Sequence, residues 1–231
     1  REFPKADAVK AVDQWVASFK PEDKGYEHHL LEALWIKQNH NVADIDHLVR
    51  VLNSPDYHAR AAGVRVLSHW RDRLPENRVL ELLHERANDE HPRVRLETIR
   101  ACSWVNTAAA AEIALETVKH PRDYYIDYAL SETIRGMESI WKSAIMSGVP
   151  FAANNPAGVE FILGSIPTAA LENLPKSAPV YLALLTRPAV KEQQRLEALS
   201  GLSKAKASSE LAELTGAIEY VDRNDLAGAN Q

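Results

Sequence analysis

The stretch LETIRACSW, residues 96–104, returns in part as SETIRGMES at residues 131–139. Glu-Thr-Ile-Arg recurs after 35 positions, and the same step backwards from Arg100 reaches Arg65 in GVRVLSHW. A pair of helices of this length cannot bury its apolar faces alone, so neighbouring pairs must stack on one another. The repeat therefore predicts an all-α fold, an α-α superhelix in which helical repeats form a solenoid.

Apolar residues recur at spacings of three and four along almost the whole chain, and no segment alternates convincingly with a period of two. This pattern is typical of helices that bury one face. Pro92 and Pro121 lie near expected helix starts, where the missing N–H of proline costs nothing. The predicted helices cover residues 6–20, 26–40, 44–53, 56–72, 76–88, 92–105, 108–118, 122–146, 157–166, 177–186, 189–204 and 208–223.

One segment interrupts this helical pattern. SGVPFAANNPAG, residues 147–158, is rich in Gly, Pro and Asn, as irregular connections are. Helical spacing resumes directly after it, so we interpret the segment as an insertion or a seam rather than a linker. The predicted division is a leading helix at 1–25, helical repeats at 26–147, an irregular insertion at 148–158, and further helical pairs of the same solenoid at 159–231.

Composition narrows the class of function. The chain has 231 residues, of which 45% are hydrophobic and 26% charged, enough to bury a sizeable core. Its net charge is −5 and the charges are interspersed, so no basic surface of the kind that binds nucleic acid is expected. Cys102 is the single cysteine, which excludes an internal disulfide and a multi-cysteine metal site. No apolar run approaches the roughly 20 residues that span a bilayer, so no direct membrane span is expected.

The motif DEHPRVRLETIRACSW, residues 89–104, resembles the second half of a HEAT repeat. Asp and Pro lie where the tight turn is expected, and Val-Arg opens the second helix. The resemblance is strong over residues 42–146 and moderate over 177–223. It departs at 122–146, where the predicted helix is too long and Tyr-Tyr stands in place of Val-Arg. The resemblance implies a scaffold or protein-interaction module.

In HEAT solenoids the second helices line the concave side, so the resemblance implies a continuous polar inner surface here. The helical period places Arg93, Glu97, Arg100 and Trp104 in one stripe, and the 35-residue step adds positions in the neighbouring repeats. Candidate partner-binding residues on this surface are His58, Arg65, His69, Arg93, Glu97, Arg100, Trp104, Tyr128, Glu132 and Arg135.

Two interpretations of this surface remain open. Arg65, Arg100 and Arg135 can pair with Glu97 and Glu132 of adjacent repeats as a solvated ladder, each pair contributing up to ~1 kcal/mol. Alternatively, Arg and Trp are both enriched at binding hot spots and make the surface a site for a protein partner. The two interpretations are compatible.

A second pair of arginines has an expected structural role. Arg60 and Arg95 lie on the flank of their helices and resemble the HEAT arginine that contacts a turn aspartate. Asp56 and Asp89 are the expected acceptors, so these four residues form the predicted structural ladder.

The segment YEHHLLEALWIKQNH, residues 26–40, has the highest density of groups that bind metals. His28 and Glu32 have the spacing of a two-ligand clamp, and His29 shares a helix face with His40. Two ligands do not complete a site, and a third would have to come from His47 or another helix. We therefore weigh metal binding against polar or partly buried histidines that serve structure.

HPRDYYIDYAL, residues 120–130, places Asp123 and Asp127 one helical turn apart. Paired carboxylates can act in acid-base catalysis if a cleft raises one pKa. At a helix start they also stabilise the positive end of the helix dipole, which is the simpler explanation. Neighbouring tyrosines are expected mainly to pack between repeats, with a recognition surface as the alternative; these are Tyr124, Tyr125 and Tyr128.

Tryptophans and the cysteine are expected to pack in the core. Trp35, Trp70 and Trp104 lie about 35 positions apart, as repeated packing positions would. Cys102 lies beside an apolar stripe, which indicates a buried, inert thiol. No phosphate-binding glycine loop, haem-attachment motif or nucleophile elbow is present in the sequence. We therefore expect no enzyme activity and no cofactor in this chain.

A closer resemblance rests on four segments: EHHLLEALWIKQNHNV, RAAGVRVLSHWRDRLP, HPRVRLETIRACSW and HPRDYYIDYALSETIRGMESIW. Over residues 26–146 they look like the HEAT segment of large bacterial, planctomycete-type membrane-bound dehydrogenases. In that family a propeller-like dehydrogenase region precedes the HEAT segment and a c-type cytochrome domain follows it. The resemblance implies an excised module from the periplasm or cell envelope that spaces the parent's domains or docks a separate protein.

Two other functions stay open on the sequence. One is an accessory domain that binds a small ligand or a metal through His28, His29, Glu32 and His40. The other is a free-standing cytoplasmic HEAT adaptor. The expected partner in the favoured interpretation is protein, either other domains of a parent chain or a separate molecule.

Overall fold

The computed structural model describes residues 4–147 and 151–228. Over these residues the chain forms fourteen α-helices, two short 3-10 helices and no strand, which confirms the predicted all-α class of helical-repeat solenoid. The chain divides into two compact units, the first ending at Ile140 and the second beginning at Trp141.

The first unit contains eight complete α-helices. They are α1 (Lys5–Ala17), α2 (Tyr26–Asn39), α3 (Ile45–Leu52), α4 (Tyr57–Trp70), α5 (Glu76–Ala87), α6 (Pro92–Cys102), α7 (Ala108–Glu116) and α8 (Tyr124–Gly136), with the 3-10 helices η1 (Arg71–Arg73) and η2 (Thr117–Lys119). The division between the units falls inside α9 (Glu138–Met146). These bounds agree with the predicted helices to within a few residues, except at α8 and α9.

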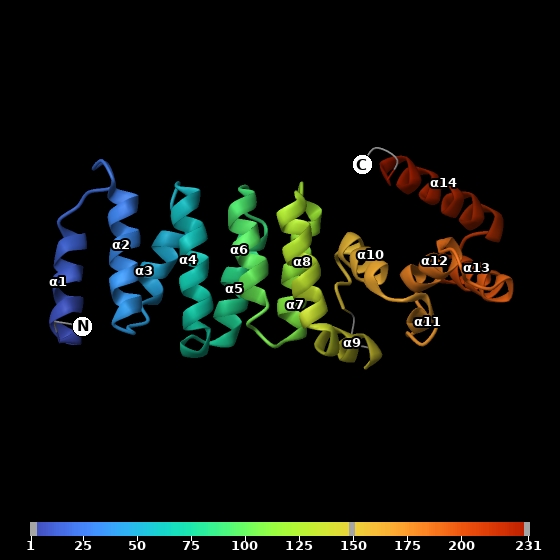
Figure 1. Ribbon diagram of the computed structural model, residues 1–231, viewed down its shortest axis with the longest axis horizontal. Coiled ribbons are helices and arrows are strands. Elements are labelled where there is room, and N and C mark those ends of the chain that lie inside the picture. Colours follow the sequence, from blue (N-terminus) through green and yellow to red (C-terminus); the bar gives the residue numbers. More distant parts are fainter. Residues whose placement is uncertain (1–3, 148–150, 229–231) are drawn as a thin grey trace. The chain divides into compact units, whose positions relative to one another are not determined.

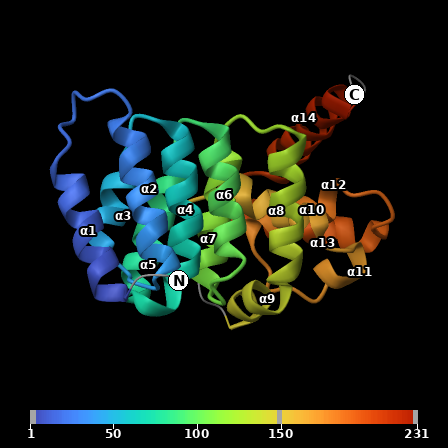
Figure 2. The same ribbon diagram turned by 60° about the vertical axis from the view of Figure 1, so that its left-hand side comes forward.

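Helices of the first unit stack in two layers. Figure 1 shows α2, α4, α6 and α8 side by side, with α3, α5 and α7 forming a second layer behind them. Contacts follow this order: α4 packs on α6, α6 on α8, α3 on α4 and α5 on α6. Figure 2 shows the same row of four from another side. We call the outer surface of α4, α6 and α8 the second-helix face.

Side-chain caps explain why these helices begin where they do. Asp44, Asp56 and Asp123 precede α3, α4 and α8, and each accepts a hydrogen bond from a backbone N–H of the first turn. Thr107 does the same for α7, and the His91 ring for α6. Each such cap satisfies a donor that the helix itself cannot satisfy, and contributes about 1 kcal/mol.

The core of the first unit repeats with the sequence. Val64, Ile99 and Ile134 occupy equivalent positions, one residue before each repeated arginine, and all three are buried. Burial of each such side chain contributes roughly 1.5–3 kcal/mol. The arginines that follow are exposed in every case, so the 35-residue step places equivalent residues in equivalent surroundings.

The single helix predicted at 122–146 is wrong, because the structure has two helices there. α8 ends at Gly136, and the N–H of Met137 turns back to the carbonyls of Thr133 and Arg135. Glycine weakens a helix interior, and the Met137 side chain is buried at the break, which favours ending the helix here.

α8 also carries an additional turn at its start. α4 and α6 begin at Tyr57 and Pro92, 35 positions apart, whereas α8 begins at Tyr124, only 32 positions after Pro92. Its later residues keep the 35-residue register, since Thr133 is buried as Thr98 is. α8 therefore begins one turn earlier in the repeat than α4 and α6 do.

The second unit is built from α10 (Pro156–Ser165), α11 (Thr168–Leu171), α12 (Ala178–Thr186), α13 (Glu192–Lys206) and α14 (Glu210–Gly228). α12 packs on α10, α13 and α14. The short α11 is not predicted by the sequence pattern. Part of the predicted insertion, 148–150, lies outside the described residues; 151–155 are not helical, and the remainder belongs to α10.

α12 and α13 approach each other closely at one glycine. A Cβ atom at Gly201 would lie 2.4 Å from Cζ of the Tyr181 ring. Glycine at this position therefore lets the Tyr181 ring pack on the α13 backbone.

None of the described helices is long and apolar enough to cross a membrane.

Candidate functional site

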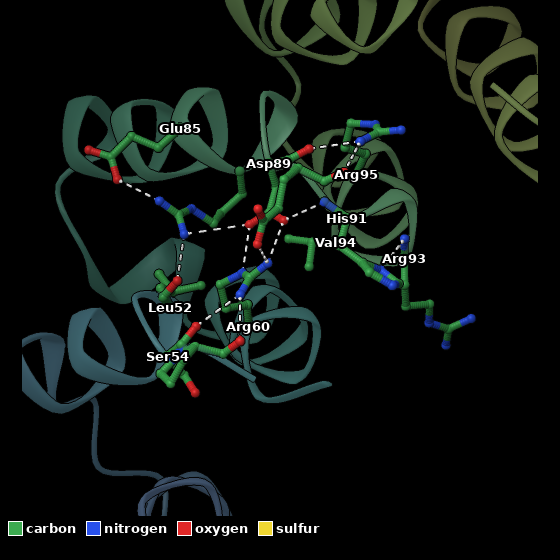
Figure 3. Close-up of polar contacts among 12 residues, drawn as sticks. Leu52, Ser54, Arg60, Glu85, Asp89, His91, Arg93, Val94 and Arg95 are labelled. Carbon is green, nitrogen blue, oxygen red and sulfur yellow. Dashed lines mark hydrogen bonds and ion pairs between the residues drawn. The ribbon is translucent and has the colours of Figure 1, made fainter. Parts of the chain in front are cut away.

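A buried ion pair links two consecutive repeats of the first unit. Arg60 of α4 donates from Nε and Nη2 to the two carboxylate oxygens of Asp89, at 2.8 and 2.9 Å. It also donates from Nη1 to the carbonyls of Ser54 and Pro55 in its own turn. Figure 3 shows the two side chains facing each other between α4 and the turn before α6. Arg60 therefore connects the turn that precedes α4 to the turn that precedes α6.

Asp89 is ionised in this pair. Burial alone would raise its pKa, but the hydrogen bonds from Arg60 and from the His91 N–H outweigh burial and lower the pKa. The pKa of Arg60 is raised in turn, mainly by its hydrogen bonds to Asp89. The pair is held by charge-assisted hydrogen bonds in a bidentate arrangement.

Asp56 is not the acceptor for Arg60, which corrects the sequence prediction. Its carboxylate caps α4 and accepts from the N–H of His58, while Arg60 reaches forward to Asp89. Arg95 also lacks the predicted carboxylate: its Nη1 donates to the backbone carbonyls of Asp89 and Glu90. The predicted ladder is therefore one ion pair followed by an arginine that binds carbonyl oxygens, including that of Pro121.

A second cluster lies on the second-helix face and is centred on Glu97. The Glu97 side chain is only 2% exposed, yet three arginines contact its carboxylate. Arg65 of α4 lies 2.6 Å away, while Arg93 and Arg100 of α6 lie 2.8 and 3.3 Å away. We call Arg65, Arg93, Glu97 and Arg100 the arginine cluster.

The carboxylate of this cluster is also ionised. Burial would raise the pKa of Glu97, but the hydrogen bond from Arg65 and the charges of the three arginines lower it. The arginine side chains remain between 46% and 64% exposed. A single buried negative charge therefore lies beneath three partly exposed positive charges.

Eight of the ten candidate residues on the second-helix face are exposed. Glu97 is buried beneath the arginines, and Glu132 is half-buried and pairs with Arg135 one turn later in α8. Arg100 pairs with Glu97 of its own helix, not with Glu132. The exposed residues are His58, Arg65, His69, Arg93, Arg100, Trp104, Tyr128 and Arg135.

Trp104 is 62% exposed, so the prediction of a repeated tryptophan packing position is wrong for it. Trp70 is buried, and the residue 35 positions later is Val105, which is also buried. Trp104 instead corresponds to exposed His69. Trp35 is also exposed. The guanidinium carbon of Arg71 lies 5.8 Å from the Trp104 ring centre, a distance typical of a cation-π contact.

The tyrosines at the start of α8 do not pack between repeats, which corrects the favoured prediction. Tyr124, Tyr125 and Tyr128 are all exposed. The Tyr124 ring contacts the other two, with ring centres 5.6 and 6.3 Å apart. Tyr124 and Tyr125 belong to the additional turn of α8, whereas Tyr128 corresponds to exposed Arg93 one repeat earlier.

The two aspartates of α8 have separate structural partners. Asp123 caps the helix and accepts from the N–H of Ile126 at 2.9 Å. Asp127 pairs with Arg122 at 2.9 Å. This arrangement fits the simpler prediction, in which acidic groups stabilise a helix start.

The histidines of α2 are engaged in stacking and pairing. His29 stacks on Phe19 with ring centres 4.4 Å apart and meets Trp15 edge-on. His28 lies 3.6 Å from Glu32. Within the part of the chain that the structure describes, no group of three or more His, Cys, Asp or Glu side chains is placed to hold a metal ion. The structure therefore gives no support to a site formed by these residues and His40.

Lys37 is a buried charge that the sequence analysis missed. It contacts Asp13 of α1 at 2.6 Å and Asp44 before α3 at 2.5 Å. Burial would lower the pKa of Lys37, but these hydrogen bonds raise it. Its place in line with the buried Leu30 and Leu34 of α2 was the available signal, since a lysine at an apolar position needs a partner.

The second unit contains two adjoining apolar cavities of about 410 and 330 Å³, which share Pro156, Leu163 and Pro179. The larger lies among α10, α12 and α14, and Glu160 and Tyr220 on its wall are joined by a hydrogen bond.

The Cys102 thiol of the first unit is fully buried, and burial raises its pKa to about 12.

Comparison with known protein families identifies the repeats. Residues 45–135 match the family described as HEAT repeats. The match covers α3 to α8, which are the helices that hold both the Arg60–Asp89 pair and the arginine cluster. No curated protein and no solved structure gives a significant match. The HEAT-like part of the chain is therefore a helical repeat of a kind that commonly mediates protein interactions.

Proposed function

We propose that this chain is a non-catalytic HEAT-like scaffold that binds a protein partner on its second-helix face. The observation that carries the proposal is the set of eight exposed residues on α4, α6 and α8 and just after α6, with arginines at one repeated position. Arg and aromatic residues contribute most of the binding energy at protein interfaces. A surface rich in both is suited to docking.

Burial supports a binding role over a purely structural one. Arg60 and Arg95 are the arginines that hold the turns of their repeats, and both are buried. Arg65 and Arg100 lie on another side of the same helices, Arg135 lies on α8, and all three are exposed. Arg65 and Arg100 keep buried Glu97 ionised, but about half or more of each side chain stays exposed, so this structural contact leaves surface for a partner.

The non-catalytic part of the proposal is supported by the candidate reactive groups. Asp123 and Asp127 are each held by a structural contact rather than facing one another in a cleft. The Cys102 thiol is buried and its raised pKa keeps it protonated, whereas a nucleophilic thiol needs a lowered pKa.

We also propose that the module belongs to a larger cell-envelope protein with dehydrogenase and cytochrome domains. The support is the sequence resemblance over residues 26–146. The full reading frame in the source genome tests this directly: a haem-attachment motif in the same frame is the expected result, and a frame without either neighbouring domain contradicts it.

The binding proposal is tested by affinity capture from an extract of the source cells. The immobilised wild-type chain is compared with the double variant Arg100→Glu, Trp104→Ala, which changes two exposed residues. Arg78→Glu serves as the matched control, because Arg78 is a partly exposed arginine of α5 whose only described ion pair is with the neighbouring Glu81. Circular dichroism and urea unfolding check that all three chains are folded.

Wild type and the Arg78 variant are expected to retain a common protein that the double variant loses. Equal retention by the double variant removes the second-helix face as the docking surface. Failure of the folded wild type to retain any protein contradicts the scaffold proposal itself.

A further inference from the structure

The three arginines of the arginine cluster carry more positive charge than the single carboxylate of Glu97 neutralises. Three guanidinium groups surround one carboxylate, so the four side chains together have a net charge of +2. Among the described residues, no other carboxylate pairs with Arg65, Arg93 or Arg100. This local excess stands out in a chain whose net charge is −5.

The geometry leaves these guanidinium groups able to bind a second anion. Each guanidinium has five N–H donors in a planar fork, and the contacts with Glu97 use only one or two of them. About half of each side chain is exposed. The remaining donors are therefore available to a ligand that arrives from solvent, and carboxylates fit this fork in a bidentate way.

Glu97 holds the three side chains in place before a ligand arrives. A free surface arginine loses side-chain entropy when it is fixed by a partner, and prior fixing reduces that cost. The buried carboxylate contacts both α4 and α6, so it fixes arginines from two repeats at once. This arrangement is a preorganised anion-binding surface rather than a set of mobile charges.

The three guanidinium groups converge on one carboxylate, so they form a single compact positive patch. Arg65 lies on the neighbouring helix, and Trp104 with Arg71 lies beyond Arg100 at the end of α6. An extended segment along α6 would therefore meet charges first and an aromatic ring last.

We propose that the arginine cluster binds an acidic protein segment in extended conformation, whose carboxylates bind the guanidinium donors that Glu97 leaves free. This inference rests on the proposed function and names the chemistry of its partner. Nucleic acid is a weaker match, because its binding depends on neutralising a long run of phosphates and the chain is acidic overall.

The probe is a fluorescein-labelled peptide of about 12 residues, Gly and Ser with Glu at every third position, a length that covers α6 in extended form. Fluorescence anisotropy measures its binding to the full chain. Companion probes are the same peptide with Gln for Glu and a single-stranded oligothymidine of similar length.

The test variant is Arg65→Gln, Arg100→Gln, which leaves Arg93 to pair with the buried Glu97. The matched control is Arg50→Gln, Arg78→Gln, which removes the same charge from an exposed position on α3 and a partly exposed one on α5. We expect the test variant to weaken binding about tenfold, as for two exposed charge pairs, and the control to leave it within about twofold. Binding of the spaced peptide should exceed that of its Gln counterpart and fall with added salt.

Three results would overturn the inference: no binding of the spaced peptide, equal losses in the two variants, or tighter binding of the oligothymidine. The peptide is also added as a competitor to the affinity capture described above. Capture that depends on Arg100 and Trp104 but resists this competitor leaves the scaffold proposal standing and removes only the acidic partner. Loss of both binding and capture contradicts the two proposals together.

Discussion

Two carboxylates, Asp89 and Glu97, perform different tasks with the same chemistry. Asp89 is buried with a buried arginine, and the pair joins two turns. Glu97 is buried beneath exposed arginines, which it orients toward solvent. Removing one partner of a fully buried pair leaves an uncompensated charge, whereas exposed groups are rescued by water. The two sites therefore respond differently to substitution.

Asp89→Asn should lower the free energy of unfolding by about 3 kcal/mol, because buried Arg60 loses its bidentate partner. Urea unfolding followed by circular dichroism measures the change. Glu90→Gln is the control, since Glu90 also contacts Arg60 but its side chain is 85% exposed. Its loss should cost under about 1 kcal/mol. Equal effects of the two substitutions would contradict the assignment of Asp89 as the main partner.

Stability should fall in acid through these same carboxylates. The folded-state pKa values of Asp89 and Glu97 lie below their ordinary values of 3.8 and 4.5. Their contributions are therefore fully present above those ordinary values and are lost as the pH falls through the lower folded-state values. Urea unfolding between neutral and acidic pH measures the slope, and Glu97→Gln should make it shallower. An unchanged slope in that variant would show that Glu97 is not held by the arginines.

At the scale of elements, small displacements along a helix change what a residue does. The additional turn of α8 carries two exposed tyrosines, Tyr124 and Tyr125, that have no counterpart in the helices α4 and α6. A difference of one position places Trp104 at a surface site and Val105 at the buried site that Trp70 occupies one repeat earlier. Residue type alone therefore does not specify packing in a repeat; register does.

Gly201→Ala should destabilise the second unit, because the added methyl would lie 2.4 Å from the Tyr181 ring of α12. Overpacking of this kind costs about 1–3 kcal/mol. Gly216→Ala in α14 is the control, since nothing lies within 4 Å of the position that its added methyl would take and alanine favours a helix by up to ~1 kcal/mol. Thermal unfolding compares them, and Tyr181→Leu should relieve the Gly201 variant. Equal effects of both alanines would contradict the close approach.

At the scale of the whole molecule, the sequence was sufficient for the helices and for the repeat of the first unit. Apolar spacing and prolines specify helices locally, so most predicted bounds lie close to those observed. The break at Met137 was missed because the apolar pattern continues across it. The partner of Arg60 was misassigned because Asp56 is near in sequence, whereas Asp89 comes close only when repeats stack.

The residues of the candidate surface were predicted, but which of them pair and which lie buried beneath the others was not. Helical period and the 35-residue step place ten residues on the second-helix face, and eight are exposed. That Glu97 lies underneath the others depends on how closely α4 and α6 pack, which the sequence pattern does not contain. Lys37 illustrates the same limit, since both of its carboxylate partners come from other segments.

The alkylation rate of Cys102 can be used to measure local opening of the first unit. The thiol lies at the end of α6 with no exposed surface, and only its thiolate reacts with alkylating reagents. A reagent can reach it only during the moments when the end of α6 opens. The rate of alkylation in the native chain therefore measures how often the end of α6 opens. Because Cys102 is the single cysteine of the sequence, the measurement needs no introduced label and no other thiol contributes to it.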